Sequence, residues 1–279
     1  MIDGQESAVA EALRGAFDGA GMAMVYQPKI RLADGTLNSV EALLRWTDAT
    51  LAEIGTERLV GIAERQGLIE ELTCWGLRTA LLQWREWQAQ GIDTRIAFNI
   101  SAMSLGSLDF PDLVEAICRE HQVPPEKLLI ELTEGATQPL VNLLDTLCRF
   151  RIKGIALALD DFGTGYSSLM QLHQLPFTEV KIDRSFIRDV ERSEDSRLIA
   201  RTIIDLAHGL EMTVTAEGIE TAEQLSLLRE LGCDLGQGYW ISPPMPPAAL
   251  PGWKRAFEGG WGGADGLELW SSRGAAAAG

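Results

Sequence analysis

The sequence predicts one α/β domain, a TIM-type (β/α)8 barrel with one antiparallel strand near its start. Short apolar segments alternate with amphipathic helical segments across residues 95–241, which is the pattern of repeated βα units. Two extended segments precede this region and are joined by the turn residues Ala33, Asp34 and Gly35. Counted together, they give eight strands with intervening helices within about 250 residues, the usual size of such a barrel.

The opening of the chain is expected to add an amphipathic helix over 5–18, with Val9, Leu13 and Phe17 on one face. Apolar residues then continue in helical spacing over 56–90, where Gly67 predicts a break. The expected strands are 24–30, 37–46, 95–100, 128–132, 155–159, 180–182, 214–216 and 235–241. We therefore divide the chain into an N-terminal helix or linker remnant at 1–22, the barrel at 23–257 and a flexible tail rich in Gly and Ala at 258–279.

The charge balance is strongly acidic, with 40 Asp and Glu against 24 Lys and Arg and a net charge of −16. Such a chain is unsuited to a sequence-independent grip on a nucleic acid polymer or on an anionic membrane surface. No apolar run approaches the ~20 residues of a membrane span, and no charged-then-apolar leader opens the chain. Four cysteines lie far apart without a CxxC motif, which is typical of reduced thiols. The expected location is the cytoplasm.

Two adjacent carboxylates, Asp160 and Asp161, stand where the apolar strand 155–159 ends. Ionised neighbours repel each other and removing them from water costs several kcal/mol, so the fold must supply a cation, a shared proton or strong donors. A divalent metal ion is the simplest of these. The glycines that follow, Gly163 and Gly165, permit a sharp turn, which could present backbone N–H groups to an anion or could be an ordinary loop.

Polar side chains stand at or near the end of nearly every expected strand. They are Glu41, Asn99, Glu131, Asp160, Asp161, Lys181, Glu217 and Gln237. The carboxyl ends of barrel strands meet at one face, where TIM-barrel chemistry takes place. Five carboxylates and one amide meeting there suit hard ions such as Mg²⁺ or Mn²⁺, and two ions fit this set better than one. Two ions that share one aspartate can activate a water molecule and stabilise charge on a phosphate.

Each of these residues has a structural alternative when it is considered alone. Glu41 could face solvent, Asn99 could cap a helix, and Glu217 could pair with a lysine. Lys181 could form a salt bridge, or it could orient or help to deprotonate an attacking water molecule. The repeated placement of polar groups at the same end of apolar strands favours the functional interpretation.

Several ordered motifs point to one family. They are 26–28 (YQP), 41–46 (EALLRW), 99–101 (NIS), 131–134 (ELTE), 160–168 (DDFGTGYSS), 181–186 (KIDRSF), 216–220 (AEGIE) and 237–239 (QGY). These segments closely resemble the EAL family of cyclic di-GMP phosphodiesterases, over about residues 26–246. The resemblance implies a barrel with one antiparallel strand, dependence on Mg²⁺ or Mn²⁺, and hydrolysis of one phosphodiester of cyclic di-GMP to linear pGpG, which lowers the level of this bacterial second messenger.

The resemblance also implies a ligand set for two ions. By position, the ligands of a first ion are Glu41, Asn99, Glu131 and Asp160. Asp160 would bridge to a second ion, which Asp161 and Glu217 would also hold. Lys181 would position the nucleophilic water, so the implied catalytic residues are Lys181, Glu41 and Glu217.

Other positions are implied to hold the substrate or the network around it. They are Gln27, Arg45, Glu220 and Gln237. A guanidinium such as that of Arg45 can fork onto phosphate oxygens. Glu134 resembles the glutamate that steadies the loop 161–168, which lies near the dimer contact of relatives, so a homodimer is implied.

One segment departs from the family pattern. Relatives usually carry a Pro-containing loop that ends in Phe-Ile-Pro, whereas this chain has the segment 47–61 ending in Leu59, Val60 and Gly61. The departure affects the expected rim of the substrate pocket and the turnover rate, because no implied metal ligand falls there.

Two other functions stay open on the sequence. One is a receptor module that binds cyclic di-GMP without cleaving it, although receptors of this family typically lack a metal ligand or the lysine. The other is a phosphodiesterase that acts chiefly on another nucleotide. Relatives often join this domain to sensory or GGDEF domains, so such a domain could lie upstream in a longer protein.

Overall fold

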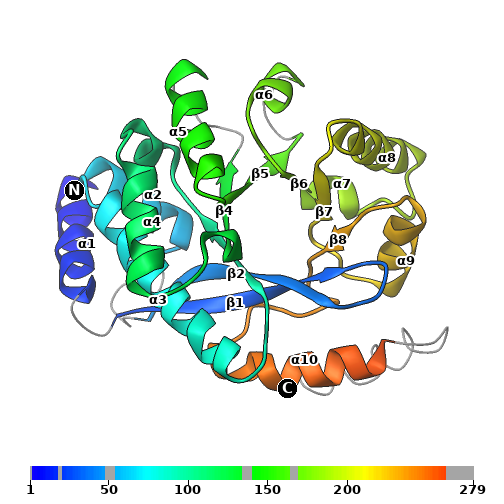
Figure 1. Ribbon diagram of the computed structural model, residues 1–279, viewed down its shortest axis with the longest axis horizontal. Helices are drawn as coiled ribbons and strands as arrows, with labels where there is room; N and C mark the ends of the chain where they lie inside the picture. The colour runs from blue at the N-terminus through cyan, green and yellow to red at the C-terminus, as the bar shows by residue number, and fades with distance from the viewer. Residues whose placement is uncertain (1, 18–20, 48–53, 134–139, 164–168, 262–279) are drawn as a thin grey trace.

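In the computed structural model, eight strands close into a barrel in chain order, and helices surround it (Figure 1). The structure describes residues 2–17, 21–47, 54–133, 140–163 and 169–261. Strand β1 (Met22–Arg31) runs antiparallel to both of its neighbours, β2 (Leu37–Trp46) and β8 (Leu235–Gly236), and the other neighbouring strands are parallel. The predicted TIM-type barrel with one antiparallel strand near its start is therefore confirmed.

The remaining strands are β3 (Arg95–Asn99), β4 (Leu128–Thr133), β5 (Ala156–Phe162), β6 (Glu179–Ile182) and β7 (Thr213–Ala216). The helices are α1 (Ile2–Phe17), α2 (Thr56–Arg65), α3 (Ile69–Ala89), α4 (Phe110–Glu120), α5 (Leu140–Ile152), α6 (Leu169–Gln174), α7 (Arg184–Ile187), α8 (Glu194–Gly209), α9 (Ala222–Glu230) and α10 (Leu250–Gly260). Three 3₁₀ turns complete the order, η1 (Ala102–Gly106), η2 (Pro125–Lys127) and η3 (Pro247–Ala249).

The local predictions hold for the hairpin and for the break at Gly67, which lies between α2 and α3. The prediction of a last strand over 235–241 is wrong beyond Gly236, where β8 ends. The chain turns there, with the backbone amides of Ile241 and Ser242 both donating to the carbonyl of Gly238. Gly238 packs so closely on the next loop that a Cβ atom would lie 2.2 Å from the backbone nitrogen of Ile219. The hydrogen-bonded turn after Gly238 thus takes the place of the predicted end of the strand.

The strands present different residues to the two sides of the barrel. Outward-facing residues such as Ile96, Ile130 and Val180 are fully buried in the large hydrophobic core that includes the surrounding helices. Ala97, Leu129 and Ala158 form a separate apolar cluster in the interior. Charged and polar residues occupy many of the other interior positions, and these residues build the candidate site.

The two ends of the described chain pack against the barrel. Helix α1 buries Val9 and Leu13 in a core cluster shared with α2 and α3. Helix α10 lies across the outside of the β1–β2 hairpin (Figure 1) and continues to Gly260, so the first residues of the predicted tail are helical. Glu258 in this part accepts a hydrogen bond from the amide of Leu37, at 3.2 Å. The rest of the predicted tail, 262–279, lies outside the described residues.

None of the helices that the structure describes is both long and apolar enough to cross a membrane. The four cysteines are free, as predicted, with Cys118 and Cys233 buried and Cys74 and Cys148 half-buried.

Candidate metal centre at the carboxyl end of the barrel

The side chain of Lys181 lies at the centre of a group of carboxylates. Its Nζ atom is 2.7 Å from Glu217, 3.0 Å from Glu131, 3.1 Å from Asp160 and 3.8 Å from Glu41. These residues come from β6, β4, β5, β2 and the loop after β7, and Lys181 is 1% exposed. The convergence predicted from the strand ends is therefore present in the structure.

Side-chain amides fix the orientation of Glu41. Asn99 on β3 donates to one carboxylate oxygen of Glu41 at 2.7 Å, and Gln237 donates to the other at 2.6 Å. Gln237 also donates to Gln27 at 3.1 Å, and Gln27 donates in turn to the backbone carbonyl of Ser242 at 3.0 Å. Gln27 and Gln237 thus belong to the network around the site, one of the two roles implied for them.

A local irregularity brings Asp160 and Asp161 to the same place. Successive residues of a regular strand point to opposite faces, yet both aspartates reach the site. The register of β5 against β6 shifts between Leu159 and Phe162, and Asp161 has a positive φ of 55°. Oxygen atoms of Asp160, Asp161 and Glu217 lie within 4.8 Å of one another, a grouping that could hold a metal ion.

The loop that carries Glu217 requires a glycine at its next residue. Gly218 has φ +68°, and a Cβ atom there would lie 2.5 Å from the Cβ of Arg184. The amide of Glu217 donates to the carbonyl of Ile182 at 3.1 Å, and the amide of Ile219 donates to that of Gln237 at 3.1 Å. These contacts hold Glu217 over the end of the barrel.

Burial and mutual repulsion shift the pKa values of the cluster upward. Burial raises the pKa of Glu217 to about 8, the carboxylates of Asp160 and Glu41 add to the rise, and Lys181 opposes it. Burial likewise raises the pKa values of Glu41 and Asp160. Burial would lower the pKa of Lys181, but Glu131, Glu217 and the other carboxylates outweigh burial and raise it well above the usual value. The lysine is an ammonium ion in the metal-free protein.

Glu131 behaves differently from its neighbours. Burial would raise its pKa, but the ammonium groups of Lys181 and Lys29 hold the pKa below its usual range. Glu131 has no exposed surface, so it is a buried carboxylate that stays charged.

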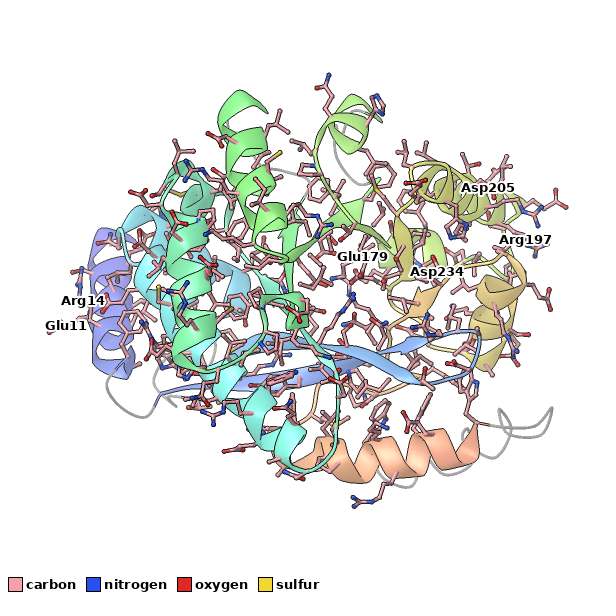
Figure 2. All side chains as sticks on the ribbon, in the orientation of Figure 1. Glu11, Arg14, Glu179, Arg197, Asp205 and Asp234 are labelled. Carbon is pink, nitrogen blue, oxygen red and sulfur yellow. The ribbon has the colours of Figure 1, made fainter. Side chains whose placement is uncertain are left out.

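Lys29 and Glu179 lie beneath the cluster, and they are not among the site residues predicted from the sequence. Nζ of Lys29 is 3.1 Å from Glu131 and 2.5 Å from Glu179. Figure 2 shows Glu179 toward the middle of the molecule, whereas Glu11 and Arg14 of α1 lie at its periphery. Strand alternation could have found both residues, because Lys29 stands two positions after Gln27 and Glu179 two positions before Lys181.

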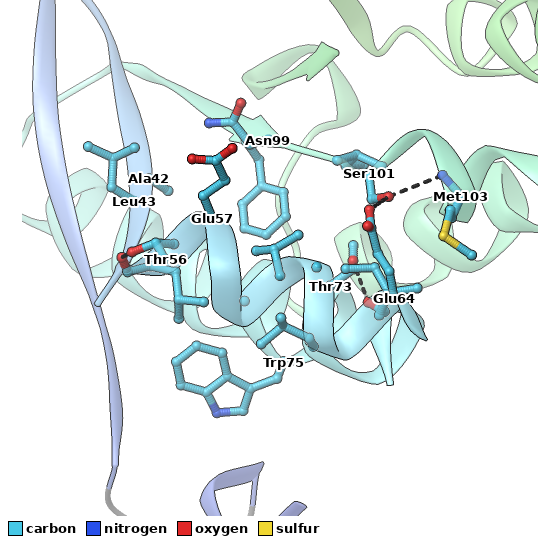
Figure 3. Close-up of a pocket in the computed structure, with 18 of the residues that line it drawn as sticks. Ala42, Leu43, Thr56, Glu57, Glu64, Thr73, Trp75, Asn99, Ser101 and Met103 are labelled. Carbon is cyan, nitrogen blue, oxygen red and sulfur yellow. Dashed lines mark hydrogen bonds between the residues drawn. The ribbon is translucent and has the colours of Figure 1, made fainter. Parts of the chain in front are cut away.

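A cavity of about 1040 Å³ reaches the site at Asn99, the residue that donates to Glu41. It lies between β2, β3, α2, α3 and η1, and Asn99, Trp75 and Met103 are among its lining residues (Figure 3). Seven residues of α2 line it: Thr56, Glu57, Arg58, Val60, Gly61, Glu64 and Arg65. The segment that departs from the family pattern therefore forms one wall of this cavity.

The other predicted site residues lie farther from Lys181 or outside the described chain. Arg45 lines the cavity and donates to the carbonyl of Leu44 at 2.8 Å. Glu220 is exposed, and its backbone amide donates to the side chain of Gln224 at 2.7 Å. Glu134 and residues 164–168 of the glycine-rich turn lie outside the described residues.

Comparison with known proteins identifies close relatives of this chain. The family model described as EAL domain matches residues 10–244. The chain is 40% identical over 91% of its length to the cyclic di-GMP phosphodiesterase NbdA of Pseudomonas aeruginosa, and 35% identical over 85% of its length to the cyclic di-GMP phosphodiesterase RocR of the same organism. It spans only 33% of NbdA and 61% of RocR.

Solved structures agree with this relationship. The structure described as PaMucR phosphodiesterase, c-di-GMP complex, superposes with a TM-score of 0.81 at 36% identity, covering 87% of this chain and 99% of that chain. The family match, the identity to these relatives and the shared barrel lead to one conclusion. This chain belongs to the EAL domain family.

Proposed function

We propose that this chain is a metal-dependent phosphodiesterase that hydrolyses one phosphodiester of cyclic di-GMP to linear pGpG, using two divalent cations, Mg²⁺ or Mn²⁺. The observation that carries the proposal is the gathering of Glu41, Glu131, Asp160 and Glu217 around Lys181 at the carboxyl end of an EAL-family barrel. Relatives named cyclic di-GMP phosphodiesterases and a related structure in complex with c-di-GMP support the choice of substrate.

The charges at the site support two cations. Six carboxylates lie in the interior, those of Glu41, Glu131, Asp160, Asp161, Glu179 and Glu217, and they face the two ammonium groups of Lys29 and Lys181. With all six carboxylates ionised, as metal ligands are, these described residues carry an excess of four negative charges, which two divalent ions would neutralise. Burial and the neighbouring carboxylates disfavour the charged form of Glu217 in the metal-free protein, and a bound cation would favour it.

The donor set suits hard cations. We assign Glu41, Asn99, Glu131 and Asp160 to the first ion. We assign Asp160, as the bridge, with Asp161 and Glu217 to the second, in keeping with the 4.8 Å grouping of their oxygens. Bound cations would supply polarisation of the phosphate and a lowered pKa of the attacking water.

The protein groups then orient the reactants. In the metal-free protein the surrounding carboxylates keep Lys181 protonated, and as an ammonium group it can donate a hydrogen bond to the attacking water. Of its two expected roles, orientation is therefore the one we propose. The water oxygen forms a bond to phosphorus while the bond from phosphorus to the ribose 3′ oxygen breaks. The attacking water loses one proton and the leaving 3′ oxygen gains one, which gives a 3′ hydroxyl and the 5′-phosphate of pGpG. Arg45 at the edge of the cavity can fork onto a phosphate, and the apolar wall around Trp75 can accept a base.

A receptor that binds cyclic di-GMP without cleaving it is the alternative function. The excess of negative charge argues against it, because a metal-free cluster of carboxylates repels an anionic ligand. The homodimer and an upstream sensory or GGDEF domain stay predictions from the family resemblance. Sedimentation of the purified chain, with and without cyclic di-GMP, would test the dimer.

The activity can be tested on purified protein by chromatography of the products. With Mg²⁺ or Mn²⁺ we expect conversion of cyclic di-GMP to pGpG, and with a chelator we expect none. Glu41→Ala should fold and should lose almost all turnover. A panel with cyclic di-AMP and other nucleotides tests the substrate choice, and intact cyclic di-GMP after incubation with either ion would refute the proposal.

A further inference from the structure

Lys29 and Glu179 form an ion pair beneath the candidate metal centre, and neither has a role in the mechanism above. Lys29 is fully buried, and its Nζ atom lies 2.5 Å from Oε1 of Glu179. The hydroxyl of Thr215 donates to the same oxygen of Glu179 at 2.7 Å. Glu179 is thus held from two sides, and it holds Lys29 in turn.

The carboxylate of Glu131 contacts a different lysine at each oxygen. Oε1 accepts a hydrogen bond from Lys29 at 3.1 Å, and Oε2 accepts one from Lys181 at 3.0 Å. Lys181 also contacts Asp160 and Glu217, so Oε2 is the oxygen on the side of the candidate metal centre. Oε1 is occupied on the opposite side, inside the barrel.

We propose that Lys29 is a positioning residue that keeps Oε1 of Glu131 turned into the barrel, so that Glu131 offers a single oxygen, Oε2, to the first cation. The inference rests on the proposed function, because it needs Glu131 to be a metal ligand. Without Lys29 the carboxylate is free to rotate about its last bond and to offer either oxygen or both. Residues that orient metal ligands in this way contribute strongly to metal affinity.

A purely structural role for the pair makes a different prediction. Buried ion pairs add little net stability, and apolar residues of similar size can often replace them without loss. If Lys29 served only to neutralise Glu179, removing both charges together would leave the metal centre unchanged. If Lys29 positions Glu131, removing both charges would restore the fold but not the metal affinity.

The test compares the wild type with Lys29→Met, Lys29→Met/Glu179→Met and Lys29→Gln. Mn²⁺ binding is measured by isothermal titration calorimetry without any nucleotide, and melting temperature is measured in chelator. We expect Lys29→Met to melt lower than the wild type and the double variant to recover most of this loss. Both variants should bind Mn²⁺ about 10- to 100-fold more weakly than the wild type. Lys29→Gln keeps a neutral donor for Oε1 and should bind with intermediate affinity.

Lys127→Met is the matched control, because it removes a lysine from a surface pair with Asp93 and should leave Mn²⁺ affinity unchanged. The inference is overturned if the double variant binds Mn²⁺ as tightly as the wild type. If the double variant does not fold, the same result for Lys29→Gln overturns it. In that case the proposed function stands as long as the wild type binds Mn²⁺ and forms pGpG. A wild type that does neither overturns the proposed function, and this inference with it.

Discussion

Lys181→Met in the metal-free protein tests whether this lysine compensates the charge of the carboxylates around it. The lysine is 1% exposed and has carboxylate oxygens of Glu41, Glu131, Asp160 and Glu217 within 3.8 Å. Methionine nearly matches its length and removes the charge. The carboxylates then lose the cation that lies among them, and breaking a buried pair in this way costs about 3 to 5 kcal/mol. At about 2.1 cal/mol/K of unfolding entropy per residue, that corresponds to a fall in melting temperature of about 5 to 9 °C.

Bound metal and low pH should both reduce this loss of stability. Saturating Mn²⁺ should return much of the lost stability, so the metal-induced rise in melting temperature should be larger in Lys181→Met than in the wild type. The loss should shrink toward low pH, because the unpaired carboxylates can take up protons there. Scanning calorimetry in chelator and in Mn²⁺ measures both effects, with Lys127→Met as the surface control.

The account is refuted if Lys181→Met melts within about a degree of the wild type in chelator. It is equally refuted if Mn²⁺ stabilises the two proteins by the same amount. Either result would mean that the four carboxylates do not depend on the lysine for charge compensation.

Three further predictions concern the loop residue Glu217 and its supports. Glu217→Gln should leave the metal-free protein as stable as the wild type or more so, because the pKa of about 8 already favours the neutral form of Glu217. The variant should also lose most of the Mn²⁺-induced rise in melting temperature, because it lacks a ligand of the second ion. A full metal response in this variant would contradict the assignment. In chelator the wild type should lose stability, on the order of 1 to 3 kcal/mol, as pH rises from about 5 through about 8. The folded-state pKa of Glu217 lies above the ordinary value of 4.5, so the proton that stabilises the folded state is lost across that interval. A melting temperature that rises over the same range would contradict this prediction. Gly238→Ala should displace the loop at Ile219, where a Cβ atom would lie 2.2 Å from the backbone nitrogen. It should therefore weaken Mn²⁺ binding more than Gly209→Ala, a helical position with open space around it and no positive φ. Equal binding in both variants would show that the loop does not depend on this contact.

Local sequence patterns were sufficient for the fold. The alternation of apolar segments and the turn around Gly35 give the strand order and the antiparallel start, because both depend on neighbouring residues. The final strand failed beyond Gly236 because the close approach of Gly238 to Ile219 is a contact between distant segments. No local pattern reports that contact.

The site residues that could be predicted from the sequence are those near the carboxyl ends of strands. Asn99 and Glu131 follow from their place at or near the ends of parallel strands, and Glu41 lies in the part of β2 that pairs with β3. The convergence of Asp161 with Asp160 depends on a bulge with a positive φ, which the alternating pattern of a strand does not show.

The buried layer under the site was harder to predict for a different reason. Alternation places Lys29 on the same face as Gln27, but a lysine within a strand is more often exposed than buried. Its burial follows from partners on β4 and β6, across the interior of the closed barrel. Only the closure of the barrel identifies those partners.

The most direct test of the central claim is to titrate the metal-free protein with Mn²⁺ in the presence of cyclic di-GMP and to follow bound ions and pGpG together. The account predicts two ions per chain at saturation, with product appearing as the second site fills. Saturation at one ion with full turnover, or release of pGpG in the presence of a chelator, would contradict it.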